Sequence, residues 1–468
     1  MYLTNFLLIK EIDENNTLLI NTLSGAIDLI GKKEKKLLSC LLKRNEKVSL
    51  EKSLETKLRE RDYLFNTKEE EAVVFNQLTR LLSERSISLP EFYLCYTYDC
   101  NLKCNYCNEK HLNDQVKKIK TMRSNQLEAV LNIILTIKEA SRSEEKGTMV
   151  LFGGEPLLPI NRDSVIRTLN FAKKEKFLVR IISNGTLIKS FREVLSNYQD
   201  IIETVAISLD GTRDIHDQRR AFPSGGGSFD QILEGINILL SEGLKVEVRP
   251  IVDRENIGFL PDLADFIINQ GWTRYENFSA KIAKTMFPFK LTKLDYPFEI
   301  SNFEFIKQLN ILNKKYSAMS VYGSSWLGDF QPFVYLRKFL DDQELITPRL
   351  SGCKAVAPGM YIFGPDNLIY PCLELIGIPQ YATGRFYPRF EEFPAREHWR
   401  KFKILEWSPK CRRCNIITLC GGGCPLVYLV SGNHERDDQE CTEIKKTLDT
   451  YIEINKTKFL RKTQKFDY

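Results

Sequence analysis

The sequence contains no run of about 20 apolar residues, which a helix needs to cross a bilayer, although 43% of its 468 residues are hydrophobic. It also lacks the pattern of a secretory signal, because Met1–Lys10 leads directly into the acidic segment Glu11–Glu14. An excess of charge of one sign is missing as well, since 67 basic side chains are mixed with 61 acidic ones. We therefore expect a cytoplasmic protein with no membrane partner and no nucleic-acid partner.

The chain is too long for one compact core, so we expect several domains. Residues 1–89 begin with two short apolar runs around the turn Asp13–Asn16, which indicates a hairpin. The expected strands are Phe6–Ile9 and Thr17–Asn21, and helical patterns follow at Glu34–Leu42, Leu50–Arg59 and Glu69–Ser83. This arrangement resembles a winged-helix peptide-recognition element. An accessory domain with no role in peptide binding is the alternative.

Residues 90–316 alternate between strand and helix patterns, which predicts an α/β fold with a parallel sheet, here a partial (β/α)6 barrel. The expected strands are Phe92–Tyr98, Met149–Phe152, Val179–Ser183, Thr204–Leu209, Lys245–Ile251 and Asn277–Ala283. The expected helices are Asn125–Ala140, Asp163–Lys174, Phe191–Tyr198, Phe229–Gly243, Phe259–Asn269 and Glu304–Lys315. In such folds the carboxyl ends of the strands carry the chemistry.

Residues 317–350 show no clear period and are expected to bridge to a cysteine-dense segment, residues 351–468. That segment is rich in Gly and Pro, which suits a domain stabilised by metal clusters. Cysteines in a cytosolic protein seldom form disulfides, so metal ligation is favoured. Ten of the twelve fall into two groups: Cys100, Cys104 and Cys107, then Cys353, Cys372, Cys411, Cys414, Cys420, Cys424 and Cys441.

The first group, Cys100-x3-Cys104-x2-Cys107, directly follows the first predicted strand of the barrel. A structural zinc site normally has four protein ligands, and no fourth cysteine completes one here, although His111 lies close. Three thiolates on a 4Fe-4S cluster would leave one iron open to a chelating ligand. The spacing therefore favours a cluster over zinc.

This spacing, with the aromatic Tyr106 before the last cysteine, resembles the signature of the radical S-adenosylmethionine (SAM) enzymes. The resemblance runs from Phe92 to about Ile282 and continues to the last cysteine. It implies that Cys100, Cys104 and Cys107 hold a 4Fe-4S cluster, and that SAM is cleaved reductively to a 5'-deoxyadenosyl radical.

Polar or glycine-rich residues after the later strands match the same family. The resemblance implies that Gly153, Gly154 and Glu155 contact the methionine amino group of SAM, with the glycines allowing close approach of the backbone. It assigns the sugar and carboxylate of SAM to Ser183, Asn184, Ser208 and Asp210. In the segment His216–Arg220, similar to the family's H-D-x-x-R, Arg220 would pair with the carboxylate, with Arg219 as the alternative. No catalytic acid or base is assigned.

The second group, Cys411-x2-Cys414-x5-Cys420-x3-Cys424 followed by Cys441, resembles the SPASM extension of radical SAM peptide-modifying enzymes. That resemblance implies two auxiliary 4Fe-4S clusters, hence three clusters in all. Cys411, Cys414, Cys420 and Cys441 would hold one, and Cys353, Cys372 and Cys424 the other, proximal one. Zinc is the alternative, because the pair Cys411 and Cys414 would suit a zinc knuckle.

Family members that convert a Ser or Cys to formylglycine typically have one further cysteine between the equivalents of Cys353 and Cys372, and this chain has none. An iron of the proximal cluster is therefore expected to be open. The usual glycine five residues before Cys372 is replaced by Asn367, which tolerates the same left-handed backbone geometry. The open site favours a maturase that joins a cysteine sulfur to a carbon of a precursor peptide with a leader sequence. A flavodoxin or ferredoxin would donate electrons.

Several other functions stay open on the sequence alone. The enzymatic alternatives are oxidation of a Cys or Ser side chain, as in anaerobic sulfatase maturases, carbon–carbon cross-linking and epimerisation. An iron–sulfur electron carrier or a peptide-binding module would not cleave SAM at all.

Overall fold

The computed structural model describes residues 1–43, 50–84, 89–107, 121–141, 146–285, 296–327, 331–342, 348, 350, 353–356, 359–431 and 438–463. The chain divides into two compact units. The smaller unit comprises residues 1–86, 329–353 and 402–468, and the larger comprises residues 87–328 and 354–401. In the part of the chain that the structure describes, every helix is too short or too polar to cross a membrane.

The larger unit is built on a sheet whose ten described strands run in the order β12-β10-β9-β8-β7-β6-β14-β15-β16-β17. The six predicted strands are all present and parallel to their neighbours. They are β6 (Glu91–Cys95), β7 (Thr148–Phe152), β8 (Leu178–Ser183), β9 (Ile202–Ser208), β10 (Val246–Arg249) and β12 (Phe278–Ala280). The short parallel pair β11 (Ile251–Val252) and β13 (Ala283–Lys284) lies in the continuation of the last two predicted strands.

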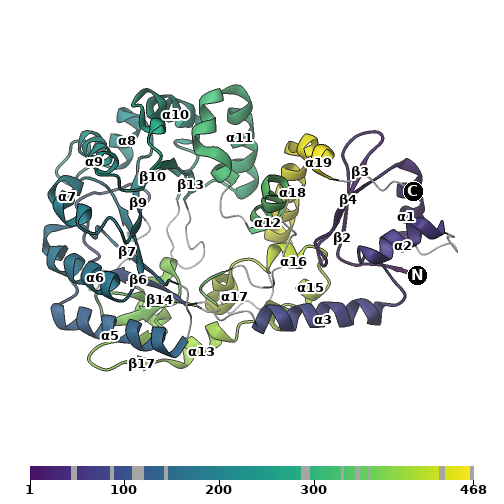
Figure 1. Ribbon diagram of the computed structural model, residues 1–468, viewed down its shortest axis with the longest axis horizontal. Helices are drawn as coiled ribbons and strands as arrows, with labels where there is room; N and C mark the ends of the chain where they lie inside the picture. The colour runs from purple at the N-terminus through teal and green to yellow at the C-terminus, as the bar shows by residue number, and fades with distance from the viewer. Residues whose placement is uncertain are drawn as a thin grey trace. The chain divides into compact units, whose positions relative to one another are not determined.

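Helices cover one face of this sheet, as Figure 1 shows for α5, α6, α7 and α9. The six predicted helices are α5 (Ser124–Ser141), α6 (Arg162–Lys174), α7 (Ile188–Ser196), α9 (Phe229–Ser241), α10 (Leu260–Asn269) and α11 (Asn302–Lys315). Apolar residues at helical spacing explain the packing: Ile232, Ile236 and Leu239 of α9 are buried. One further helix, α8 (Arg213–Arg219), was not predicted, because its seven residues are mostly charged.

The short helical turns of this unit are η2 (Pro159–Asn161), η3 (Ile257–Phe259), η4 (Trp272–Arg274) and η5 (Ser317–Leu327).

Part of the cysteine-dense segment extends the central sheet. Strand β14 (Met360–Phe363) pairs in parallel with β6, so its carboxyl end lies at the same sheet edge. The antiparallel strands β15 (Leu368–Tyr370), β16 (Gly384–Arg385) and β17 (Glu391–Glu392) follow, then α13 (Pro394–Arg400). The short turns η6 (Leu373–Leu375) and η7 (Pro379–Tyr381) lie between β15 and β16. Asn367 turns the chain into β15 with φ of 71°, which confirms the left-handed geometry expected there.

The smaller unit begins with a module that has its own core, formed by side chains such as Leu19, Leu58 and Tyr63. The predicted hairpin is present as β2 (Leu7–Glu11) and β3 (Thr17–Asn21), with a third strand, β4 (Ile27–Ile30), that was not predicted. The strands β1 (Tyr2–Leu3) and β5 (Leu64–Phe65) also pair. The three predicted helices are α1 (Lys32–Lys43), α2 (Lys52–Glu60) and α3 (Lys68–Glu84).

Helices form the rest of the smaller unit. They are α12 (Gln331–Asp342), α14 (Ile404–Trp407), α15 (Pro409–Arg412), α16 (Ile417–Cys420), α17 (Pro425–Ser431), α18 (Asp438–Ile454) and α19 (Lys456–Lys462). The sequence assigned residues 351–468 to one domain, whereas the structure divides them after Cys353 and again after Lys401. The reason is the pairing of β14 with β6, which makes residues 354–401 an extension of the central sheet.

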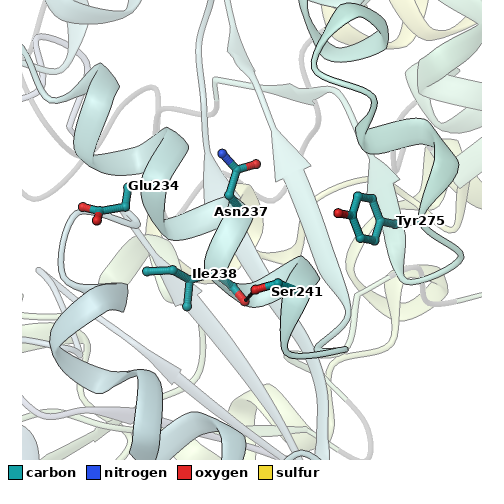
Figure 2. A pocket seen from close by; sticks show the side chains of 5 residues that line it. All are labelled: Glu234, Asn237, Ile238, Ser241 and Tyr275. Atoms are coloured by element: carbon teal, nitrogen blue, oxygen red, sulfur yellow. Dashed lines mark hydrogen bonds between the residues drawn. The ribbon is translucent and has the colours of Figure 1, made fainter.

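A surface depression beside α9 lies away from the carboxyl ends of the strands. It is lined by Glu234, Asn237, Ile238, Ser241 and Tyr275, from the second half of α9 and the segment before β12 (Figure 2). Its polar groups are largely engaged, because Asn237 accepts a bond from Trp272 and the Ser241 hydroxyl donates to the carbonyl of Ile238. The predicted site residues lie instead at the edge of the sheet formed by the carboxyl ends of the parallel strands.

Candidate active site at the carboxyl edge of the sheet

The segment that carries Cys100, Cys104 and Cys107 is bound to the end of β8 on one flank. The side chain of Asn101 donates to the hydroxyl of Thr186 at 2.8 Å and accepts from the amide of Asn184 at 2.8 Å. Asn184 also directs its amide nitrogen at the sulfur of Cys100, 3.6 Å away. The first cysteine and a predicted SAM contact are therefore brought together.

The other flank of the same segment is bound to the residues that follow α8. The backbone nitrogen of Lys103 donates to the carbonyl of Ala221 at 2.8 Å, and that of Asn105 donates to the carbonyl of Arg219 at 3.1 Å. The side chain of Asn105 donates to the carboxylate of Glu255 at 3.1 Å. Folding of the barrel therefore sets the backbone path of the cysteine segment.

The thiols of this segment lie in a partly desolvated environment. Burial, followed by the nearby Glu155 carboxylate, raises the pKa of the Cys100 thiol to about 12, and Cys104 adds to this effect. Because metal ligation requires the thiolate, a bound cation has to displace this proton. Cys107 is the last described residue before the gap that contains His111, so the structure does not test His111 as a ligand.

Gly153 and Gly154 form the turn after β7, and the structure shows a packing reason for glycine at both positions. A Cβ at Gly154 would lie 2.1 Å from the carbonyl oxygen of Asp99, and one at Gly153 would lie 2.7 Å from that of Thr97. The Gly154 nitrogen donates to the Thr97 carbonyl at 3.0 Å, and the Glu155 nitrogen donates to the Asp99 carbonyl at 2.9 Å. Glycine is therefore needed for the close approach of this turn to the start of the cysteine segment, and its contact with SAM stays a prediction.

Glu155 is fully buried and joins the ends of β7 and β8. Its carboxylate accepts bonds from the Leu157 nitrogen, the Ser183 hydroxyl and the Asn184 nitrogen, at 2.9, 2.9 and 2.7 Å. Burial nevertheless raises the pKa of this carboxyl group above its ordinary value. Glu155 thus fixes two predicted SAM contacts, Ser183 and Asn184.

Asp210 and Tyr106 connect the end of β9 to the cysteine segment. The Tyr106 hydroxyl donates to the Asp210 carboxylate at 2.6 Å and accepts a bond from the Arg220 guanidinium. The Nε of Arg220 is buried without a hydrogen-bond partner. A buried guanidinium with an unused donor is suited to a carboxylate ligand such as that of SAM. The remaining predicted contact, Ser208, ends β9 with a half-buried side chain.

Arg219, the alternative to Arg220, is already surrounded by acceptors. It is 1% exposed and bonds to Asp253 at 2.8 and 3.0 Å, to Glu255, and to the carbonyl of Ile251 at 3.2 Å. It also forms an ion pair with Asp210 at 3.5 Å. Although burial opposes the charge, the carboxylates of Asp210 and Asp253 raise the pKa of Arg219. The geometry therefore favours Arg220 as the ligand for an added carboxylate.

His216 links Asp210 to Arg220 through a chain of hydrogen bonds. The Asp210 nitrogen donates to Nδ1 of His216 at 3.2 Å, so Nε2 carries the proton toward the Ser228 hydroxyl 3.0 Å away. That hydroxyl donates to the carbonyl of Arg220 at 2.7 Å. Burial and the two neighbouring arginines hold the pKa of His216 well below its usual range, which keeps the ring neutral.

The four cysteines assigned to the first auxiliary cluster, Cys411, Cys414, Cys420 and Cys441, all belong to the smaller unit. Burial raises the pKa of the Cys414 thiol, and the neighbouring sulfurs of Cys420 and Cys411 raise it further. The fourth, Cys441, lies on α18. Among the described residues, no three Cys, His, Asp or Glu side chains converge as ligands of one ion. The assignment of these four cysteines to an auxiliary cluster rests on their spacing in the sequence and stays a prediction.

The proximal ligand set stays a prediction. Cys353 and Cys424 belong to the smaller unit, whereas Cys372 follows β15 in the larger one. The two cysteines outside both groups have structural positions. Cys95 is buried on β6, where its thiol donates to the carbonyl of Thr97, and Cys40 is half-buried on α1.

Sequence reasoning missed several residues that position the site, among them Asn101, Asn105, Asp253 and Glu255. Asp253 and Glu255 directly follow β11. The rule that polar residues after a strand lie at the sheet edge could have found them if β11 had been recognised. The two asparagines lie between the cysteines, and their spacing carries no signal of the partners that they contact.

The comparisons with known proteins agree with this geometry. Residues 94–267 match the family described as the radical SAM superfamily. A cysteine-type anaerobic sulfatase-maturating enzyme of Clostridium novyi is 26% identical over 351 residues, or 70% of this chain and 85% of that relative. An AdoMet-dependent heme synthase of Oleidesulfovibrio alaskensis is 22% identical and aligns with 74% of this chain and 85% of its own length.

Two solved structures share the fold. Native anSMEcpe with bound AdoMet has a TM-score of 0.60 at 17% identity and covers 79% of this chain and 98% of its own. SuiB of Streptococcus suis, bound to the precursor peptide SuiA, has a TM-score of 0.53 at 16% identity and covers 93% of this chain and 99% of its own. Residues 94–267 are therefore a radical SAM domain, within a chain whose fold is that of anSMEcpe and SuiB.

Proposed function

We propose that this chain cleaves SAM reductively and uses the resulting radical to modify a ribosomally made precursor peptide. The observation that carries the proposal is the convergence at one sheet edge of the cysteine segment and Arg220, whose buried Nε has no partner. A 4Fe-4S cluster on Cys100, Cys104 and Cys107 would supply one electron to the sulfonium of SAM.

The roles of the chain's own residues follow from their contacts. Arg220, held by Tyr106 and by the hydrogen-bond chain from His216, would bind the SAM carboxylate. Asn184, fixed by Glu155 and directed at Cys100, would contact the same cofactor. Because these side chains are already fixed in the absence of SAM, little of their conformational freedom would be lost when SAM binds. This favours productive placement of the sulfonium.

Anaerobic reconstitution with dithionite and SAM tests the first part. We expect 5'-deoxyadenosine from the wild type and none from Cys104→Ala. Cys40→Ala is the matched control, since this cysteine lies on α1 outside both groups, and it should retain activity. Absence of 5'-deoxyadenosine from the fully loaded wild type under several reductants would refute the enzymatic proposal.

For the bond formed, we favour a thioether between a peptide cysteine and a carbon. The support is the count of ligands assigned to the proximal cluster, Cys353, Cys372 and Cys424, one fewer than a closed 4Fe-4S cluster uses. A substrate thiolate could take the fourth position. The substrate carbon would lose a hydrogen atom to the 5'-deoxyadenosyl radical, which becomes 5'-deoxyadenosine, and the thiol would lose a proton. The surplus electron would pass to an auxiliary cluster. A relative that acts in sulfatase maturation supports side-chain oxidation as the second candidate.

Mass spectrometry of a peptide encoded beside the gene and incubated with the enzyme separates these candidates. A thioether lowers the mass by about 2 Da and protects the cysteine from alkylation, because two hydrogens are lost and the sulfur is no longer a thiol. An unmodified thiol together with a crosslink between carbons, or an unchanged mass with an inverted residue, would refute the thioether. A flavodoxin or ferredoxin should replace dithionite in the same assay.

A further inference from the structure

The amino-terminal module, residues 1–84, makes direct hydrogen bonds to the segment that carries the auxiliary cysteines. The hydroxyl of Thr22, which follows β3, donates to the backbone carbonyl of Asn415 at 2.6 Å. The side chain of Asn415 donates in return to the carbonyl of Leu7 on β2 at 3.3 Å. Asn415 is thus bound by β2 and by the residue that directly follows β3.

The position of Asn415 makes these bonds relevant to metal binding. It directly follows Cys414 and lies five residues before Cys420, in the short segment that connects these two cysteines. Cys414 and Cys420 are assigned to the same cluster, so the path of residues 415–419 determines how their thiols are placed. Thr22 itself is fully buried, and its hydroxyl has a fixed partner in this segment.

A second contact binds the helix that carries the remaining predicted ligand, Cys441. Lys10 of β2 forms an ion pair with Asp449 at 2.5 Å. Asp449 lies on α18, the helix that carries Cys441. Both side chains are partly exposed, so this pair contributes less than the buried bond of Thr22. Strand β2 therefore contacts both pieces of chain that supply the predicted ligands.

We propose that Thr22 and Asn415 are positioning residues through which the module holds residues 411–420 in the conformation that binds an auxiliary iron–sulfur cluster. The inference rests on the auxiliary cluster of the proposed function. It gives the module a role in metal binding that does not depend on peptide recognition. Loss of either bond should raise the rate at which the segment opens about fivefold, as expected for one net hydrogen bond.

The experiment uses the full chain, reconstituted anaerobically, in a background of Cys100→Ala, Cys104→Ala and Cys107→Ala, so that bound iron reports only the auxiliary sites. Iron release to a ferrous chelator is followed for this background with Thr22→Val or Asn415→Ala added. Thr17→Val, the same change at another buried threonine of the module, is the matched control. Hydrogen exchange of the amides of residues 411–420 is measured in parallel on the cluster-free chain.

The outcomes separate the inference from the function on which it rests. Release and exchange about fivefold faster in Thr22→Val and Asn415→Ala, with Thr17→Val unchanged, support it. Rates equal to those of the control overturn it while leaving the clusters in place. A background chain that binds no iron overturns both the auxiliary cluster and this inference. SAM cleavage by the chain with its three first-group cysteines intact would then still stand.

Discussion

Arg219 offers the sharpest test of how the site is stabilised. Its guanidinium is buried against three carboxylates. Its nitrogens lie 2.8 Å from an oxygen of Asp253 and 3.5 Å from one of Asp210, and they donate a hydrogen bond to Glu255. It also lies 4.7 Å from the ring centroid of Tyr106 in the cysteine segment. Replacement by Met keeps much of the packing volume but leaves the carboxylates buried without their counter-ion.

The expected loss of unfolding free energy for Arg219→Met is about 3–5 kcal/mol, the usual cost of removing one partner of a buried ion pair. Arg219→Lys keeps the charge but lacks the planar guanidinium that pairs with both oxygens of Asp253, so it should recover only part of the loss. The measurement is chemical denaturation of the cluster-free chain followed by circular dichroism. Arg213→Met is the matched control, because Arg213 lies on the same helix in an exposed ion pair with Asp230.

The reasoning fails if Arg219→Met and Arg213→Met unfold at the same denaturant concentration. A second readout distinguishes a local role from general destabilisation. If Arg219 orders the cysteine segment through Tyr106, the electron paramagnetic resonance spectrum of the reduced first cluster should change on addition of SAM in the wild type and respond less in Arg219→Lys. An identical response in both would limit Arg219 to a structural role.

Three further predictions concern neighbouring residues. Arg220→Gln should raise the KM for SAM about 10- to 100-fold, as expected for a lost charged hydrogen bond, measured by 5'-deoxyadenosine formation; an unchanged KM would contradict the assignment. Gly154→Ala should cost about 1–3 kcal/mol on denaturation because its Cβ meets the Asp99 carbonyl, whereas Gly258→Ala, with open space at its Cβ, should not. Glu155→Gln should cost about 1–3 kcal/mol in the same assay, because its amide would face backbone donors; equal stability would show that those bonds are dispensable.

The parallel sheet could be predicted because its strands are short apolar runs separated by helices at regular intervals. Strand β11 was not recognised, because its apolar residues continue those of β10 in the sequence. Asp253 and Glu255, which follow β11, were therefore missed as well. The pairing of β14 with β6 joins residues more than 260 positions apart, and no local pattern reports such a contact. The motif glycines were identified, but the sequence did not indicate that Thr97 and Asp99 approach them closely in space.

The contacts of the first cysteine segment also indicate the order in which the site forms. Its backbone is bound to Gly154 and Glu155 after β7, to Ala221 after α8, and its side chains to Thr186 after β8. None of these bonds involves a cysteine sulfur, so the folded sheet edge can define the path of the segment before a cluster is bound. The raised pKa of Cys100 disfavours the thiolate in the folded, cluster-free chain. A bound cation would compensate the negative charge that ligation requires. Cluster binding should therefore follow folding of the barrel, and chelation should remove iron without unfolding the sheet.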